Sequence, residues 1–241
     1  DSIGVDSTEE NRRDYRELLF RSKGMKGNIG GVILFDETIR QKAKDGTLLR
    51  DIISDQGALP GIKVDKGLQP IEDCPNETVT VGLDGLDERL KEYSSMGAKF
   101  TKWRAVINIG DGIPTDKCID ANMQALADYA KCAQDNGMVP IVEPEVLMDG
   151  EHNIDQCFEA TERSLKSLFS HLEKASVNIK GTLLKPNMVT SGKDATDQAS
   201  VEEVAKKTLD CLIANVPAEL PGITFLSGGQ SEILATAHLD A

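Results

Sequence analysis

The sequence has no long apolar run. None of its apolar stretches comes near the roughly 18 consecutive residues that a helix needs to cross a membrane. The segment from Asp1 to Glu10 is polar and acidic, whereas a secretory signal has a basic start followed by an apolar core. We therefore expect a cytoplasmic protein that is neither exported nor inserted into a membrane.

Basic residues are also scarce. Lysine and arginine together number 27 against 40 aspartates and glutamates, which gives a formal net charge of −13. A surface with this excess of negative charge repels nucleic acids and anionic lipids. The composition argues against both as partners, and an anionic ligand would have to be held by a local cluster of basic side chains.

Cysteine and histidine lack the spacings of disulfide and metal sites. The five cysteines lie far apart with no CxxC pair, and an odd number favours reduced thiols over a disulfide framework. His152, His171 and His238 show neither HxxH nor HExxH spacing, and none follows a predicted strand. We interpret the three histidines as surface or loop residues and expect no metal site.

What the chain does contain is a regular alternation of short apolar runs and longer segments of helical spacing, separated by glycine or proline. This rhythm is typical of βα units around a parallel sheet. Six strands are predicted, each followed by a helix, at residues 30–35, 61–64, 100–109, 139–142, 181–184 and 222–226. No repeat or linker divides the chain, so we expect a single α/β domain over residues 1–241. A closed eight-stranded barrel would need two more strands.

Polar side chains recur where the predicted strands end. In an α/β barrel the carboxyl ends of all strands meet at one mouth, so side chains far apart in the sequence converge there. The candidates are Lys63 at the end of the second strand, Lys102 and Arg104 in the third, Glu143 and Glu145 after the fourth, Lys185 after the fifth, and Ser227 with Gly228 after the sixth. This convergence is the main indication of a functional site.

Lys185 is the candidate nucleophile. It follows the apolar pair Leu183-Leu184 and precedes Pro186, a setting that would desolvate the ammonium group and favour the neutral amine. A neutral amine can condense with a ketone. The alternative is a lysine whose stem packs on the barrel while its charge reaches water, which is the commoner arrangement for a lone lysine. The other cations predicted at the same mouth favour the reactive interpretation.

Two acidic residues and a glycine-rich turn complete the pattern. Glu143 and Glu145 are two residues apart, so an extended backbone places them on one face, where one can stay ionised while the more buried one moves protons. Simple neutralisation of the lysines is an equally good explanation of this pair by itself. Ser227-Gly228-Gly229 leads into a helix near Ser231, which suits an anion, although a plain turn is the alternative.

Several segments, in order and at the right spacing, resemble class I fructose-bisphosphate aldolases. They are residues 1–13 (DSIGVDSTEENRR), 61–67 (GIKVDKG), 102–104 (KWR), 139–145 (VPIVEPE), 181–189 (GTLLKPNMV) and 222–231 (GITFLSGGQS). The resemblance implies a (β/α)8 barrel, of which about strands two to seven fall within this chain, without the first strand, the last strand and the C-terminal tail. It also implies a cytoplasmic homotetramer that cleaves fructose 1,6-bisphosphate reversibly, in glycolysis and gluconeogenesis, without any cofactor.

The resemblance further implies a role for each candidate residue. Lys185 would form the Schiff base with the ketone half of the substrate, and Glu143 would act as the acid and base in imine formation. Glu145 would tune its neighbours, and Lys102 would lie close to the reacting hydroxyl. Lys63 and Arg104 would hold the other phosphate, while Ser227 and Gly228 would hold the ketone-side phosphate. A cationic imine stabilises the adjacent carbanion, so no metal is required.

Three other interpretations remain open at this level. The same basic mouth could bind cytoskeletal filaments or acidic tails of membrane proteins, as aldolases of this kind do. The chain could be an inactive fragment of the barrel. A Schiff-base barrel with a different substrate is the third alternative.

Overall fold

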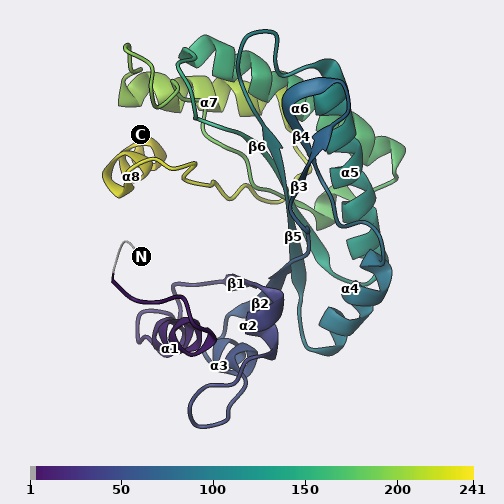
Figure 1. The fold of residues 1–241 in the computed structure, drawn as a ribbon, viewed down its shortest axis with the longest axis vertical. Coiled ribbons are helices and arrows are strands. Elements are labelled where there is room, and N and C mark those ends of the chain that lie inside the picture. Colours follow the sequence, from purple (N-terminus) through teal and green to yellow (C-terminus); the bar gives the residue numbers. More distant parts are fainter. Residues whose placement is uncertain (1–3) are drawn as a thin grey trace.

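A computed structural model describes residues 4–241, and its central element is a five-stranded parallel sheet with the strand order β1-β2-β5-β6-β7 (Figure 1). Its strands are β1 (Gly31–Leu34), β2 (Leu59–Lys63), β5 (Phe100–Ile107), β6 (Val139–Val146) and β7 (Leu183–Leu184). Every neighbouring pair is parallel. The carboxyl ends of all five strands therefore lie at the same edge of the sheet.

Helices follow the strands as the sequence pattern predicts. They are α1 (Glu9–Phe20), α2 (Asp36–Arg40), α3 (Leu49–Asp55), α4 (Leu86–Ser95), α5 (Asp116–Asp135), α6 (Ile154–Lys174), α7 (Val201–Asn215) and α8 (Glu232–Asp240), with a short 3-10 turn at Ile179–Gly181. Side-chain caps begin several of them, including Thr115 before α5 and Asn153 before α6. In residues 4–241, no helix combines the length and the apolar character needed to cross a membrane.

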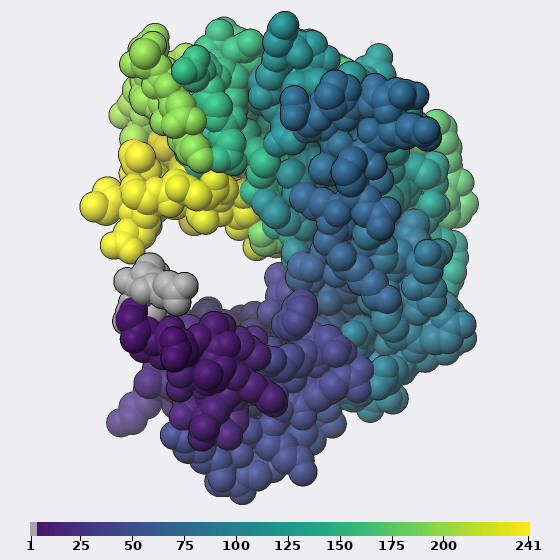
Figure 2. Space-filling model, viewed as in Figure 1, coloured from purple at the N-terminus to yellow at the C-terminus, as the bar shows by residue number. Residues whose placement is uncertain are grey.

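The molecule has the shape of an open arc. Helices α4, α5 and α6 lie along the outer side of the sheet, and α1 and α8 occupy the two ends of the arc (Figure 1). The space-filling view shows a hollow on the inner side between the segments that carry α1 and α8 (Figure 2). A parallel sheet with helices on its outer side is the arrangement of a (β/α)8 barrel.

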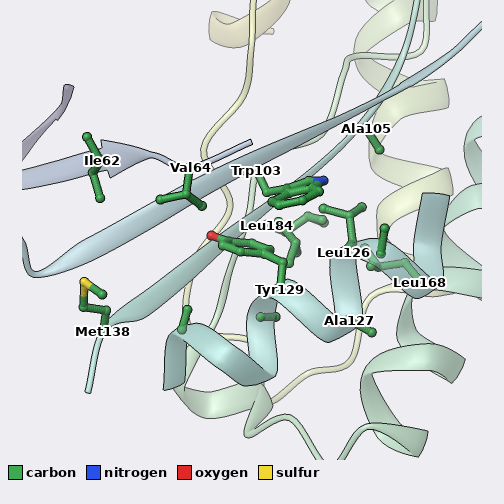
Figure 3. Close-up of a cluster of buried hydrophobic side chains, with 14 of the residues drawn as sticks. Ile62, Val64, Trp103, Ala105, Leu126, Ala127, Tyr129, Met138, Leu168 and Leu184 are labelled. Carbon is green, nitrogen blue, oxygen red and sulfur yellow. The ribbon is translucent and has the colours of Figure 1, made fainter. Parts of the chain in front are cut away.

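The core lies between the sheet and the outer helices. Trp103 of β5 stacks on Tyr129 of α5 with 5.4 Å between ring centroids and 25° between ring planes, and both side chains are fully buried (Figure 3). The Tyr129 hydroxyl lies 2.7 Å from Thr101 Oγ1, and its burial raises the pKa of Tyr129. Trp103 faces the outer helix α5, and because successive side chains of a strand point to opposite faces, its neighbours Lys102 and Arg104 point to the other face of the sheet.

The sequence did not predict the antiparallel hairpin of β3 (Leu68–Ile71) and β4 (Cys74–Thr80). These strands carry few apolar side chains and little alternation, and Asp73 and Asn76 take left-handed conformations with φ of 63° and 64°. Tertiary contacts hold the hairpin in place, since Thr80 Oγ1 donates a hydrogen bond to the carbonyl of Arg104 at 2.7 Å.

Two predicted strands differ most from the observed ones, and the others shift by one or two residues at an end. The predicted strand at residues 222–226 is reduced to one parallel bridge between Ile223 and Leu184, with hydrogen bonds from Leu184 N to Gly222 O and from Thr224 N to Leu184 O. The predicted strand at 139–142 continues to Val146, so two acidic residues lie within it rather than after it. The charges of Glu143 and Glu145 suggested that the strand ends before them. Neighbouring cations neutralise these charges, and β6 continues to pair with β5 as far as Val146.

Candidate active site

The strand register brings the predicted residues side by side. Lys63 of β2 is paired with Lys102 of β5, and Arg104 of β5 is paired with Glu143 of β6. Lys185 directly follows β7, and its amide donates a 2.8 Å hydrogen bond to Val142 O of β6. The structure therefore brings these residues side by side, although Lys102, Arg104 and Glu143 lie within their strands rather than at the strand ends.

Lys185 and Glu143 form the centre of the cluster. Lys185 Nζ donates a 2.5 Å hydrogen bond to Glu143 Oε1, and the side chains are 20% and 4% exposed. Lys102 Nζ lies 2.9 Å from Glu143 Oε2, yet this contact lacks the alignment of a hydrogen bond, so Oε2 stays open to accept one. One buried carboxylate thus lies between two ammonium groups and can exchange a proton with either a lysine or a ligand.

The second acidic residue has a different partner. Glu145 Oε2 accepts a hydrogen bond from Arg104 Nε, and this bond raises the pKa of Arg104 above its ordinary value. Glu143 and Glu145 contact basic groups on the same side of the sheet, so the predicted shared face is confirmed. Glu145 holds the Arg104 guanidinium in one position, whereas Glu143 contacts both lysines.

Sequence reasoning missed Asp65, which joins the cluster at its other end. Its side chain is 5% exposed, with Oδ1 at 2.5 Å from Lys63 Nζ and Oδ2 at 3.9 Å from Lys102 Nζ. The signal was present, because Asp65 stands two residues after the strand-ending Lys63, the same spacing that relates the two glutamates. Four cations and three carboxylates therefore alternate across the site, which leaves an excess of one positive charge.

Ser227 and Gly228 lie on the segment after the Ile223 bridge. Gly228 and Gly229 have φ of 65° and 90°, a conformation that favours glycine, and Ser231 caps α8. The predicted turn before a helix is therefore present. Within residues 4–241, however, neither Ser227 nor Gly228 contacts the lysines and carboxylates through a hydrogen bond or ion pair.

Two cavities adjoin the cluster. Lys63 and Asp65 line one of about 650 Å³ that extends toward α4. The stem of Lys185 lines another of about 440 Å³ on the inner face of the sheet, together with apolar side chains such as Phe100, Ile141 and Leu183. Lys185 therefore has an apolar surface on one side and the carboxylate of Glu143 on the other.

Of the histidines, which were predicted to be surface or loop residues, His171 departs from the prediction. His171 lies in α6, is 7% exposed and has Nε2 at 2.8 Å from Asp120 Oδ1, so that prediction is wrong for it. His152 lies in a loop but is buried, and burial lowers its pKa. In the part of the chain that the structure describes, His, Cys, Asp and Glu do not gather in groups of three or more that could hold a metal ion.

The two loops that follow β6 and β7 are joined by backbone hydrogen bonds. Lys193 N donates to Met148 O at 2.7 Å, Asp194 N to Gly150 O at 3.0 Å, and Gly192 N to His152 O at 2.8 Å. The contact is so close that a Cβ at Gly192 would lie 2.2 Å from Gly150 O. The loops beyond Glu145 and beyond Lys185 are therefore held together by backbone contacts that require glycine.

Substitution of Gly192 with alanine is expected to lower the free energy of unfolding by about 1–3 kcal/mol, because a backbone atom must move to make room. Urea unfolding followed by the fluorescence of Trp103, the single tryptophan, measures this change. Gly24→Ala is the control, since the nearest atom to its Cβ position is 3.7 Å away. Equal losses in the two variants would contradict the explanation.

Comparison with known proteins places this chain in a family. The family model described as "Fructose-bisphosphate aldolase class-I" matches residues 1–241. The chain belongs to the class I fructose-bisphosphate aldolase family. A "Probable fructose-bisphosphate aldolase class 1" of Xanthomonas campestris pv. campestris is 57% identical over 238 residues, which cover 99% of this chain and 71% of that protein.

More distant aldolases agree in sequence and in structure. "Fructose-bisphosphate aldolase 4, cytosolic" of Arabidopsis thaliana is 49% identical over 100% of this chain and 61% of that protein. A structure of fructose-bisphosphate aldolase from Plasmodium falciparum, in complex with TRAP and a small-molecule inhibitor, matches with a TM-score of 0.97 at 45% identity. It covers 99% of this chain and 70% of that one. The fold is therefore that of the class I aldolase barrel.

Proposed function

We propose that this class I aldolase cleaves fructose 1,6-bisphosphate reversibly to dihydroxyacetone phosphate and glyceraldehyde 3-phosphate through a Schiff base on Lys185. The observation that carries the proposal is the 2.5 Å hydrogen bond from Lys185 Nζ to the buried Glu143. It joins a nucleophilic nitrogen to a group that can accept and return its proton. The names of the relatives supply the substrate.

Imine formation uses this pair directly. Lys185 transfers a proton to Glu143, and the free amine attacks the ketone carbon of the substrate. A second proton moves from the nitrogen to the new alkoxide oxygen, which gives the carbinolamine. Glu143 then returns the proton to the hydroxyl of the carbinolamine, which leaves as water and produces a protonated imine. The carboxylate is 4% exposed, so bulk water competes little for these protons.

Cleavage follows from the positive charge of the imine. The electrons of the bond between C3 and C4 move to the iminium nitrogen and form an enamine, while the C4 hydroxyl loses its proton and becomes the aldehyde. Glu143 Oε2, which faces Lys102 at 2.9 Å, is the acceptor proposed for that proton, and Lys102 stabilises the oxygen. Protonation of the enamine and hydrolysis of the imine then release dihydroxyacetone phosphate and restore Lys185.

The charges of the site suit a doubly anionic substrate. Although the chain carries a net charge of −13, the cluster has more cations than carboxylates. We assign one phosphate to Lys63 and Arg104, whose side chains are 32% and 39% exposed, and the ketone-side phosphate to Ser227 and Gly228. Glu145 keeps Arg104 directed toward the site.

Substrate comparison tests this assignment. We expect fructose 1,6-bisphosphate to be cleaved with a kcat/KM at least about tenfold higher than fructose 1-phosphate, because one charge-assisted phosphate contact contributes about 1.5–3 kcal/mol. Cleavage should continue in EDTA, because an iminium replaces the metal. Equal rates with both sugars would overturn the phosphate assignment, and loss of cleavage in EDTA would overturn the Schiff-base mechanism.

We also propose that residues 1–241 belong to a single barrel domain of a cytoplasmic homotetramer active in glycolysis and gluconeogenesis. Two Arabidopsis relatives are named cytosolic aldolases, which supports the compartment. Light scattering coupled to size-exclusion chromatography would measure the assembly, and a monomer at micromolar concentration would contradict it.

Binding of acidic peptides is a second candidate function of the same surface. The Plasmodium aldolase has been solved in complex with TRAP, and the exposed fractions of Lys63 and Arg104 leave both open to a macromolecular partner. An acidic peptide that binds there should compete with fructose 1,6-bisphosphate. Binding that is unaffected by saturating substrate would place the peptide elsewhere.

A further inference from the structure

Asp65 occupies a position that the proposed reaction steps do not use. It lies two residues after the end of β2, and its carboxylate faces Lys63, Lys102 and β5. The side chain is 5% exposed, and a carboxylate at this depth is costly unless charged or polar partners compensate it. In the described part of the chain, all of its polar side-chain contacts are with Lys63, Lys102 and Arg104.

The first of these contacts fixes Lys63. Lys63 Nζ donates to Asp65 Oδ1 at 2.5 Å and to the Asp65 carbonyl at 3.1 Å, so two acceptors from one residue hold the ammonium group. A lysine side chain has many rotamers in solution, and this pair of bonds selects one of them. Lys63, which we assign to phosphate binding, therefore has its ammonium group in position before substrate binds.

The second contact joins Asp65 to β5, beyond the last residues that pair β2 with β5. Pairing of β2 with β5 ends at Lys63 and Lys102, and Val64 N still donates to Lys102 O at 3.1 Å. One step further, Arg104 N donates to Asp65 Oδ2 at 3.3 Å, where the side chain takes the place of a backbone acceptor. The same oxygen lies 3.9 Å from Lys102 Nζ. Asp65 thus fixes β5 and the direction of Lys102 together.

We propose that Asp65 is a positioning residue for the aldol reaction, which directs Lys102 toward Glu143 and holds Lys63 for phosphate binding. It acts through these lysines and does not itself touch the reacting atoms. The inference rests on the proposed function, because its effect is exerted on a reaction at Lys185. The Lys185–Glu143 hydrogen bond does not involve Asp65, so imine formation should survive its replacement while turnover should not.

The test measures imine formation and turnover separately. It uses the enzyme as it occurs naturally, with any sequence that precedes Asp1 or follows Ala241. Borohydride with dihydroxyacetone phosphate traps the imine, and mass spectrometry counts the chains modified on Lys185. Turnover of fructose 1,6-bisphosphate is then expressed per trapped chain, which removes unfolded protein from the comparison. We expect Asp65→Asn to lower kcat per trapped chain by about 10- to 100-fold, the cost of a catalytic group displaced by about 1 Å.

Glu77→Gln is the matched control. Glu77 is 2% exposed and accepts hydrogen bonds from Thr115 N at 2.7 Å and Thr115 Oγ1 at 2.6 Å, but in residues 4–241 it forms no ion pair. Its replacement should lower stability and leave kcat per trapped chain unchanged. Asp65→Glu, which keeps the charge, should retain more turnover than Asp65→Asn.

The outcomes distinguish the two proposals. If the parent enzyme traps no adduct on Lys185, the proposed function fails and this inference fails with it. If the parent traps the adduct but Asp65→Asn stays within about threefold of the parent kcat per trapped chain, only the role of Asp65 is overturned. A Glu77→Gln variant with the same loss, or an Asp65→Glu variant no better than Asp65→Asn, would also overturn that role.

Discussion

Replacement of Lys185 with methionine is expected to abolish the borohydride-stable adduct and to lower kcat by at least about 10,000-fold. Methionine keeps a linear side chain of similar length that can still line the apolar cavity on the inner face. It offers no amine, so neither the iminium nor the enamine can form. Removal of the nucleophile of a covalent mechanism leaves only the contribution of substrate binding.

The substitution also leaves Glu143 without one of its two ammonium partners. Circular dichroism and the fluorescence of Trp103 should show that the variant is folded, since Lys102 remains 2.9 Å from that carboxylate. Lys180→Met is the control, because Lys180 is exposed and lies just before β7. A folded Lys185→Met variant that retains an adduct or a tenth of the parent kcat would disprove the assignment of the nucleophile.

Replacement of Glu143 with glutamine should lower kcat by about 100- to 10,000-fold, the range for loss of a positioned acid and base. Glutamine has the same shape, but its amide cannot accept the proton of Lys185 or return it to the carbinolamine. The change also removes the carboxylate that lies between Lys102 and Lys185, and so raises the excess positive charge of the cluster. The two ammonium groups then repel each other without compensation.

This variant is distinguished from Lys185→Met by the adduct. The amine is still present, so the imine should still form and borohydride should trap it, but the rate of trapping should fall by the same factor as kcat. Quench-flow sampling of the adduct measures this rate. Glu159→Gln on the exposed side of α6 is the control for loss of one carboxylate. A trapping rate equal to that of the parent would show that another group performs the acid and base chemistry.

The sequence predicted most of the elements because each carries a local signal. The helices at α4 to α8 have the expected spacing, caps or terminal glycines, and β1, β2 and β5 are apolar runs between turn residues. The hairpin of β3 and β4 was missed because tertiary contacts, such as the hydrogen bond from Thr80 to Arg104 O, stabilise strands with weak local signals. The end of β6 was misplaced because cations from other strands compensate its charges.

The site likewise has residues that the sequence could predict and contacts that it could not. Lys185, Glu143 and Lys102 could be chosen from the sequence, because charged residues recur within or directly after several of the predicted strands. Their pairing could not, because it depends on the register of β5 with β6. Asp65 was overlooked because its burial and its contacts with Lys63 and Arg104 exist only once β2 and β5 lie side by side.

By itself, the order of residues predicted most of the helices, the strands β1, β2 and β5 and the candidate side chains of the site, because periodicity, capping and residue type act over a few neighbouring positions. The tertiary structure alone decided that Glu143 Oε1 lies 2.5 Å from Lys185 Nζ and that Arg104 engages Glu145. Hydrogen bonds and ion pairs of this kind act over a few ångströms. Only the parallel alignment of strands distant in the chain can bring such atoms within that range.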